Sequence, residues 1–270
     1  MNEQHARLMS TFNAIASHYD ELHFLHAPAT KLVELAGLTE NMRVLDVATG
    51  TGWLALPAAQ MIGSGGRLTG IDLAPEMLNQ ARLKLEIAGL HNAEFREGDA
   101  EKLSFSDHSF EAVLCGSALF FVPDMLAALK EFRRVLVPGG CAGFNSFEPG
   151  FLEPMRALWA TRLLKHGLKS GSLPFERLDS PEICLQILSN AGFTEIEVHS
   201  EQLGYFLRTA EERWAEIMAG IEGMPLSKLT PEQREQIKAE HMAEISALRT
   251  SQGFWVDVPA LFAFGRSVPN

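Results

Sequence analysis

Three aspartates and two glycines form the part of the sequence best suited to binding a polar ligand. Asp46 lies in an apolar run, and Gly50 and Gly52 follow it closely. Asp72 and Asp99 each follow a later apolar run. Glycines let the backbone bend sharply and let a ligand approach it, and the free N–H groups of a helix expected from about Thr51 would face that ligand. The pattern indicates a nucleotide-like ligand.

The three acids differ in what they could bind. Asp72 lies 20 residues after Gly52, where a carboxylate can accept hydrogen bonds from ribose hydroxyls. Asp46 stands beside the glycine turn, where it would repel a pyrophosphate but could receive the ammonium group of an amino acid. This favours S-adenosylmethionine over NAD. Asp99, or the N–H of Ala100, could recognise the adenine edge, with Leu73 and Met77 as apolar contacts to the ring. Taken alone, each acid could equally be a helix cap or a solvated loop residue.

Alternating strands and helices must position these residues. Five strands separated by helices over about 100 residues predict a parallel, doubly wound sheet with right-handed crossovers. Ligands bind at the carboxyl ends of such strands, which is where the three acids fall. The expected strands are 43–48, 67–72, 93–97, 110–115 and 141–147, and the expected helices end near Ile62, Gly89 and Leu136.

The flanking segments depart from this alternation. Apolar residues spaced three or four apart predict helices over 5–36, with a break near Pro28. Further strands are expected at 193–199 and 254–264, and a helix at 181–190. Capping signals at Thr209 with Glu212 and at Thr230 with Gln233 predict two more helices between these strands. We therefore expect one domain over 1–270, composed of an N-terminal helical lid (1–40), a cofactor-binding core (41–147) and helical cap insertions that bind substrate (148–180 and 205–250).

Composition narrows the class of protein. The 270 residues carry 34 acidic against 23 basic side chains, a formal net charge of −11, which argues against a nucleic-acid or anionic-membrane partner. Three widely spaced cysteines suggest neither a disulfide framework nor a metal site, so we expect no metal. No stretch is long and apolar enough for a membrane span, and no secretory signal is visible. A cytoplasmic protein, monomeric or homodimeric, is expected.

The motifs resemble those of class I S-adenosylmethionine-dependent methyltransferases. Val44 to Gly52 resembles the first motif of that family, Leu68 to Met77 its ribose-binding segment, and Glu97 to Lys102 its adenine-binding segment. Leu136 to Gly140 resembles the turn that precedes strand five. The resemblance implies a Rossmann-like α/β fold, a seven-stranded sheet of order 3-2-1-4-5-7-6 whose last strand is antiparallel.

Within that class, the chain resembles the ubiquinone/menaquinone C-methyltransferase (methyltransferase type 11) branch. Phe12 to Asp20 and the Asp46-Val47-Ala48 tripeptide carry this similarity. Ala48 replaces the first glycine of most members, as it does in the quinone branch. The resemblance implies that Tyr19 closes over the methionine end of the cofactor and that Ser117 and Leu119 line the space beside the sulfonium. The residues expected to bind the cofactor are Tyr19, Asp46, Ala48, Thr49, Gly50, Gly52, Asp72, Leu73, Met77, Asp99, Ala100 and Ser117.

Methyl transfer from a sulfonium is an in-line displacement that chiefly needs alignment and exclusion of water. A base helps if the acceptor must lose a proton. Six side chains qualify by type and location, although each could equally be a surface or packing residue. These candidate bases are His18, His23, His26, His166, His199 and Tyr205.

The acceptor is expected to be a small apolar or aromatic molecule, methylated on oxygen, nitrogen or carbon. Aromatic residues such as Phe120, Phe147, Phe151 and Phe175 gather after strand four and in the expected cap. Quinone C-methylation is an alternative, although the inserted cap argues against it. An NAD-dependent oxidoreductase and a non-catalytic cofactor-binding protein are the alternatives from other classes. Asp46 and the helical segment before the first strand argue against the NAD-dependent oxidoreductase. Turnover of the cofactor would exclude the non-catalytic binding protein.

Overall fold

The computed structural model describes residues 3–171 and 173–268. The expected domain limits at residues 1 and 270, the first two residues of the expected lid and residue 172 of the expected cap lie outside the described residues. Among the described residues, none of the helices has both the length and the apolar character that a membrane crossing requires.

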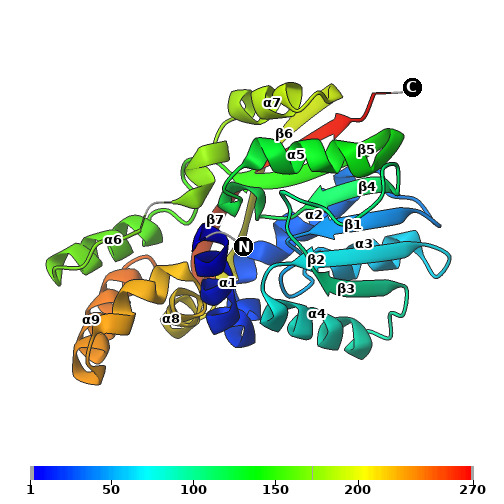
Figure 1. Ribbon diagram of the computed structural model, residues 1–270. Coiled ribbons are helices and arrows are strands. Elements are labelled where there is room, and N and C mark those ends of the chain that lie inside the picture. Colours follow the sequence, from blue (N-terminus) through cyan, green and yellow to red (C-terminus); the bar gives the residue numbers. More distant parts are fainter. Residues whose placement is uncertain (1–2, 172, 269–270) are drawn as a thin grey trace.

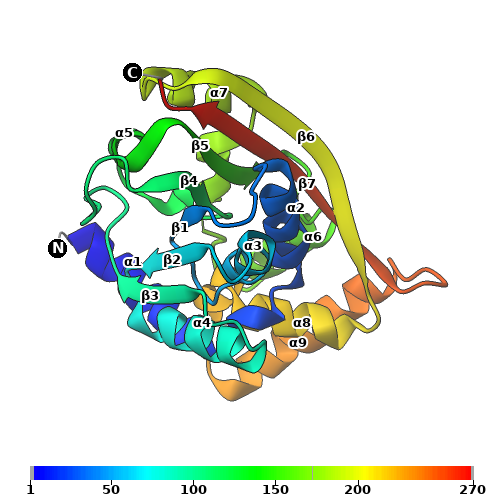
Figure 2. The ribbon, with the colours of Figure 1, turned by 90° about the vertical axis from the view of Figure 1, so that its right-hand side faces the viewer.

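A seven-stranded sheet of order β3-β2-β1-β4-β5-β7-β6 forms the centre of the fold (Figures 1 and 2), as expected. The five neighbouring strands β3, β2, β1, β4 and β5 pair in parallel. Strand β7 is antiparallel to both of its neighbours, β5 and β6. The strands are β1 (Arg43–Val47), β2 (Arg67–Asp72), β3 (Ala93–Glu97), β4 (Phe110–Cys115), β5 (Leu136–Phe147), β6 (Thr194–Leu207) and β7 (Phe254–Arg266).

The helices of the core connect these strands, and the apolar strands they cover are buried. β4 is buried along nearly its whole length, because helices cover both faces of a parallel sheet. The three cysteines are free thiols within this core. The helices that flank the parallel strands are α3 (Ala55–Ile62), α4 (Pro75–Ile87) and α5 (Met125–Val135), with the 3₁₀ turn η3 (Leu119–Phe121) before α5, whereas α7 (Pro181–Asn190) packs against β6 and β7.

The N-terminal segment is helical, but its break lies earlier than the sequence predicts. Two short 3₁₀ turns interrupt it at Ala16–Glu21 (η1) and His23–Leu25 (η2), between α1 (Glu3–Ile15) and α2 (His26–Leu35). Pro28 lies inside the first turn of α2, where a missing N–H costs no hydrogen bond.

Helices α6 (Met155–Lys165), α8 (Ala210–Ala219) and α9 (Pro231–Ser246) group together beyond one end of the sheet (Figure 1). They share a small apolar core around Trp159, Leu163 and Ile217. The 3₁₀ segment η5 (Ile221–Lys228) completes this group, which we call the cap helices, whereas η4 (Pro174–Leu178) packs against β5 and η3.

Strand β6 is twice as long as the prediction, 14 residues against the expected 193–199. It pairs with β7 as far as Leu207, so the first residues of the expected insertion 205–250 belong to the sheet. Figure 2 shows this antiparallel pair running past the edge of the parallel strands toward α8 and α9. Tyr205 is therefore held by a strand.

Candidate active site

The turn after β1 has a strained, left-handed backbone. Ala48, Gly50 and Gly52 have φ angles of 54°, 55° and 85°. Such angles are unusual for alanine, and non-glycine residues held there often mark functional sites. Helix α3 begins at Ala55, so the expected helix start near Thr51 is wrong by one turn. The residues between are irregular, which leaves the glycine turn open toward the sheet edge.

Asp46 is buried beneath this turn, and one of its carboxylate oxygens has no partner among the described residues. Its side chain accepts a 2.6 Å hydrogen bond at Oδ2 from the Thr49 hydroxyl. Its Oδ1 is buried and has no hydrogen-bond partner among the described residues. Burial and the nearby Asp72 carboxylate together raise the pKa of Asp46 to about 7, although the hydrogen bond from Thr49 opposes them. A buried carboxylate with an unpaired oxygen is a site for a cationic ligand group.

Asp72, at the end of β2, accepts hydrogen bonds from the backbone of two loops, the turn after β1 and the loop that follows β2. Its Oδ2 accepts the N–H of Gly50 at 2.9 Å, and its Oδ1 accepts the N–H of Ala74 at 2.8 Å. Burial raises its pKa despite these two bonds. Each carboxylate oxygen has a second acceptor position, so Asp72 can still receive ligand hydroxyls.

Asp99 is connected to the N-terminal helix through a histidine that the sequence analysis missed. Asp99 Oδ1 accepts the N–H of Glu101 at 2.9 Å. His5 of α1 is buried, with Nδ1 3.4 Å from Asp99 Oδ2 and Nε2 3.4 Å from Glu101 Oε2. One histidine on an amphipathic helix carries no signal in the sequence, because its partners lie about 95 positions away.

A first cavity gathers the residues expected to bind a cofactor. The N-terminal segment contributes His5, Phe12 and Tyr19 to its wall, opposite the sheet edge. Gly52 is the one expected residue that is not among the described residues lining this cavity. A Cβ at this position would lie 3.3 Å from Ala81 Cβ of α4, so this glycine allows close packing against α4. The other expected residues lining this cavity are Asp46, Ala48, Thr49, Gly50, Asp72, Leu73, Met77, Asp99, Ala100 and Ser117.

A second, largely aromatic cavity adjoins the first. The rings of Phe147 and Phe151 stack at 4.0 Å within its wall. Ser117 and Tyr19 line both cavities, as do three apolar residues, so the two spaces share a boundary. The apolar residues common to both are Phe12, Leu25 and Phe121, and the second cavity adds Phe24, Phe120, Phe147, Phe151 and Phe175.

Ser117 is fixed at this boundary by β5. Its N–H donates to Asn145 Oδ1 at 2.9 Å, and its Oγ accepts from Asn145 Nδ2 at 2.8 Å. Asn145 is fully buried, and Ser117 has a φ of 50°. Leu119, which was expected beside Ser117, is buried in the core and is not among the described residues that line either cavity.

All six candidate bases lie outside the described linings of both cavities. His18 and His199 are exposed and pair with the neighbouring Glu21 and Glu197. His26 packs edge-on against Trp53. Each of these positions suits a surface or packing role.

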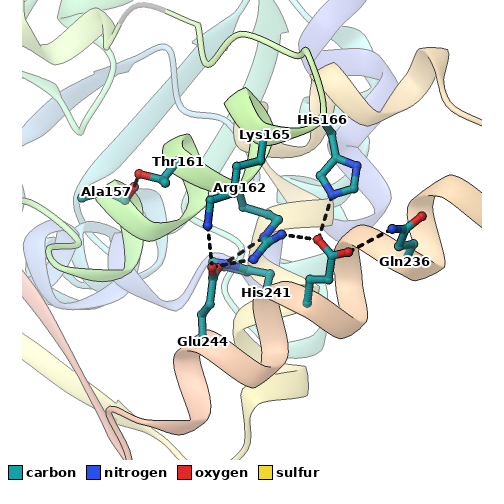
Figure 3. A network of polar contacts seen from close by, with 9 residues as sticks. Ala157, Thr161, Arg162, Lys165, His166, Gln236, His241 and Glu244 are labelled. Atoms are coloured by element: carbon teal, nitrogen blue, oxygen red, sulfur yellow. Dashed lines mark hydrogen bonds and ion pairs between the residues drawn. The ribbon is translucent and has the colours of Figure 1, made fainter.

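His166, the fourth, belongs to a polar network between two cap helices. Figure 3 shows Arg162 of α6 and His166, the residue just after α6, directed toward α9. His166 Nε2 lies 2.8 Å from Glu240 Oε2, which also accepts a bond from Arg162. Arg162 Nη2 donates to Glu244 Oε1 at 2.5 Å. This network joins α6 to α9.

The last two candidates, His23 and Tyr205, meet at a residue that was not predicted. The Tyr205 hydroxyl donates a hydrogen bond to Glu216 Oε1, and His23 Nδ1 lies 3.3 Å from the same oxygen. Glu216 is fully buried in α8 and lines the second cavity. Burial raises the pKa of Glu216, and burial beside that carboxylate raises the pKa of Tyr205.

Known proteins share both the sequence and the fold. Residues 44–140 match the Methyltransferase domain family. A demethylmenaquinone methyltransferase of Chlorobaculum tepidum is 39% identical over 57% of this chain and 66% of its own. The aklanonic acid methyltransferase DauC of Streptomyces sp. (strain C5) is 34% identical over 59% of this chain and 76% of its own.

This chain belongs to the S-adenosylmethionine-dependent methyltransferases. A SAM-dependent methyltransferase of Aquifex aeolicus shares the fold with a TM-score of 0.55 at 20% identity, over 91% of this chain and 92% of its own. The chain spans 39% to 66% of the lengths of the Chlorobaculum demethylmenaquinone methyltransferases that it matches. The matched family region, 44–140, contains the turn, Asp72, Asp99 and Ser117 but none of the cap helices.

Some residues that line the cavities of this methyltransferase were not predicted from the sequence. They lie outside the matched region, or their partners are distant in the chain. They include Arg156 of α6, Glu216 of α8 and Glu222 of η5, which are the charged residues among the described lining of the second cavity. Their charge and helical spacing fit ordinary surface positions, so no sequence signal distinguishes them.

Proposed function

We propose that this chain transfers a methyl group from S-adenosylmethionine to an aromatic small molecule. The shared boundary of the two cavities at Tyr19 and Ser117 carries the proposal, because methyl transfer requires two ligands that meet at one point. When bound, S-adenosylmethionine supplies a methyl group already activated on a sulfonium.

The lining of the first cavity fits that cofactor. The unpaired Oδ1 of Asp46 would bind its ammonium group, and the carboxylate of Asp72 would bind the ribose hydroxyls. Asp99 and the N–H of Ala100 would recognise the adenine edge, and Met77 would pack against the ring, with Leu73 beside it. Thr49, Ala48 and Gly50 would surround the methionine part.

The chain's own contribution to the reaction would be alignment and exclusion of water. The phenylalanines of the second cavity would hold a flat apolar acceptor and keep solvent from the transfer point. Tyr19 would close the methionine end, and the fixed Ser117 would shape the passage between the cavities. If the acceptor must lose a proton, Glu216 is placed to receive it, with His23 leading to solvent.

The names of the relatives support a small-molecule acceptor, since one acts on demethylmenaquinone and another on aklanonic acid. A quinone-like acceptor is therefore a specific candidate, and the aromatic cavity suits it. The net charge of −11 supports a partner other than nucleic acid, and a cytoplasmic location is part of the same proposal.

Thermal unfolding with matched ligands tests the proposal. S-adenosylmethionine and S-adenosylhomocysteine should raise the melting temperature, because a ligand at 100 times its dissociation constant adds about 2.7 kcal/mol of stability. NAD at the same concentration is the control and should have no effect. The absence of a shift with either adenosyl compound at millimolar concentration would overturn the proposal, and a shift with NAD alone would support an oxidoreductase.

A further inference from the structure

Apart from Tyr19 and Ser117 at the boundary with the first cavity, the polar side chains in the described lining of the second cavity lie on the side formed by the cap helices. There, Arg156 of α6, Glu216 of α8 and Glu222 of η5 reach its wall. Charged side chains rarely line an apolar cavity unless their polar atoms are paired. The pairing of these three residues therefore shows what the cavity is built to receive.

The buried guanidinium of Arg213 forms ion pairs with both carboxylates of this wall, those of Glu216 and Glu222. Arg213, 1% exposed, lies between the two acids, with Nη1 3.4 Å from Glu216 Oε2 and Nη2 2.6 Å from Glu222 Oε2. The remaining oxygen of Glu216 is bonded by Tyr205 and contacted by His23. Glu222 Oε1 is left: it is buried and has no hydrogen-bond partner within the described residues.

The guanidinium of Arg156 carries a buried hydrogen-bond donor that has no partner among the described residues, just as Glu222 carries such an acceptor. Its Nε and Nη2 donate to Glu153 Oε1 at 3.0 and 2.7 Å. The group lies near the ring of Phe175, 5.6 Å from its centroid, and the side chain is 18% exposed. Its Nη1 is buried and makes no hydrogen bond to any residue that the structure describes.

These two atoms are opposite in kind and belong to residues that line one aromatic cavity. Glu222 Oε1 can only accept a hydrogen bond when ionised, and Arg156 Nη1 can only donate one. A buried polar atom without a partner is unfavourable, so a ligand that satisfied both would gain affinity and orientation from each.

We propose that the methyl acceptor is a hydroxylated aromatic molecule carrying a second oxygen, bound at both ends by this pair. Its hydroxyl donates to Glu222 Oε1, and a carbonyl or carboxylate oxygen accepts from Arg156 Nη1, with the ring between the phenylalanines. The inference rests on the proposed function and specifies the acceptor of the same site. Arg213 acts as a positioning residue that directs Glu222 Oε1 into the cavity.

The test uses the full chain saturated with S-adenosylhomocysteine and titrated calorimetrically with positional isomers of hydroxynaphthoic acid. The tightest isomer is compared with its methoxy analogue, which lacks the donor, and with the corresponding naphthol, which lacks the carboxylate. We expect each loss to weaken binding about tenfold, as for hydrogen bonds to charged groups.

Two variants should distinguish how the hydroxyl and the carboxylate of the ligand each contribute to binding. Glu222→Gln should keep its carbonyl toward Arg213 and turn its NH₂ into the cavity, which abolishes or reverses the preference for hydroxyl over methoxy. Arg156→Met keeps the contact with Phe175 but should abolish only the advantage of the carboxylate. Glu235→Gln and Arg67→Met, which alter exposed residues away from the cavity, are the matched controls.

The outcomes distinguish this inference from the proposed function. If S-adenosylhomocysteine binds but no hydroxynaphthoate does, or if hydroxy and methoxy probes bind equally, the inference is overturned while the cofactor assignment stands. If both variants weaken every probe to the same extent, their effect is structural and the pair is not a recognition site. If S-adenosylhomocysteine itself fails to bind the wild-type chain, the proposed function fails first.

Discussion

The hydroxyl of Thr51 donates a 2.5 Å hydrogen bond to Asp20 Oδ1 and so joins the N-terminal segment to the turn after β1. Lys84 of α4 donates to the same oxygen at 2.9 Å, and its ammonium lies 3.8 Å from the centre of a Trp53 ring. Tyr19, the residue before Asp20, lines both cavities. These bonds fix Asp20, and with it the neighbouring Tyr19, beside the turn after β1.

Asp20→Ala should weaken cofactor binding, because it removes both bonds that hold Tyr19 in place. Since the Asp20 side chain is 48% exposed, we expect a modest effect, about threefold to tenfold in the dissociation constant of S-adenosylhomocysteine. Calorimetric titration measures it. Glu21→Ala is the matched control, because Glu21 pairs only with the exposed His18 among its described contacts. Equal affinities in the two variants would show that the Asp20 contacts do not organise the site.

Asp46→Asn should change stability and affinity in opposite directions. The folded-state pKa of Asp46, about 7, lies above its ordinary value of 3.8, so the folded protein binds more protons than the unfolded chain between these values. The contribution of Asp46 to stability is therefore lost as the pH rises through 7. The asparagine variant should melt higher than wild type at pH 8 without ligand, and it should bind S-adenosylhomocysteine more weakly.

The same titration predicts how cofactor affinity depends on pH. Only the ionised Asp46 attracts an ammonium group, so wild-type affinity should fall by up to about tenfold for each pH unit below 7. Asp46→Asn should remove this dependence. A wild-type profile that stays flat from pH 5 to 8, measured by calorimetry, would show that Asp46 does not bind the ammonium.

Gly52→Ala should destabilise the fold through a packing conflict with α4. A Cβ at this position would lie 3.3 Å from Ala81 Cβ, and the φ of 85° already disfavours alanine. Gly89→Ala is the matched control, since its φ is 68° and an alanine there would place the added carbon more than 4 Å from the surrounding described residues. Urea unfolding should show about 1 kcal/mol more destabilisation for Gly52→Ala than for Gly89→Ala. Equal losses would mean that α4 shifts freely to accommodate the methyl group.

Local signals explain why the parallel half of the fold was predictable. Apolar runs, glycine turns and capping residues report contacts between near neighbours in the chain, and they located β1 to β4 with few errors. The capping box of Thr230 and Gln233 is confirmed at the start of α9. At Thr209 only the first half of the expected box forms, because the Glu212 carboxylate accepts the N–H of Arg208 instead.

Distant partners explain the errors. Residues 200–207 are mixed in polarity and look like a loop, but β7 supplies a continuous ladder of pairs from Ser200↔Leu261 to Leu207↔Phe254. The contacts of the candidate bases depend on distant partners in the same way. A histidine's type and position say nothing about whether it will face a cavity, as His23 and Glu216 show by meeting across 193 positions.

The sequence by itself determined the parallel sheet, the glycine turn and the acids at the strand ends, because each depends on periodicity and turn chemistry within a few residues. Only the tertiary structure decided that Tyr19 and Ser117 separate two cavities and that Arg156 and Glu222 line the second. Those relationships depend on how the cap helices pack on the sheet. Amphipathic spacing shows that a helix has a buried face, but it does not show which residues that face will meet.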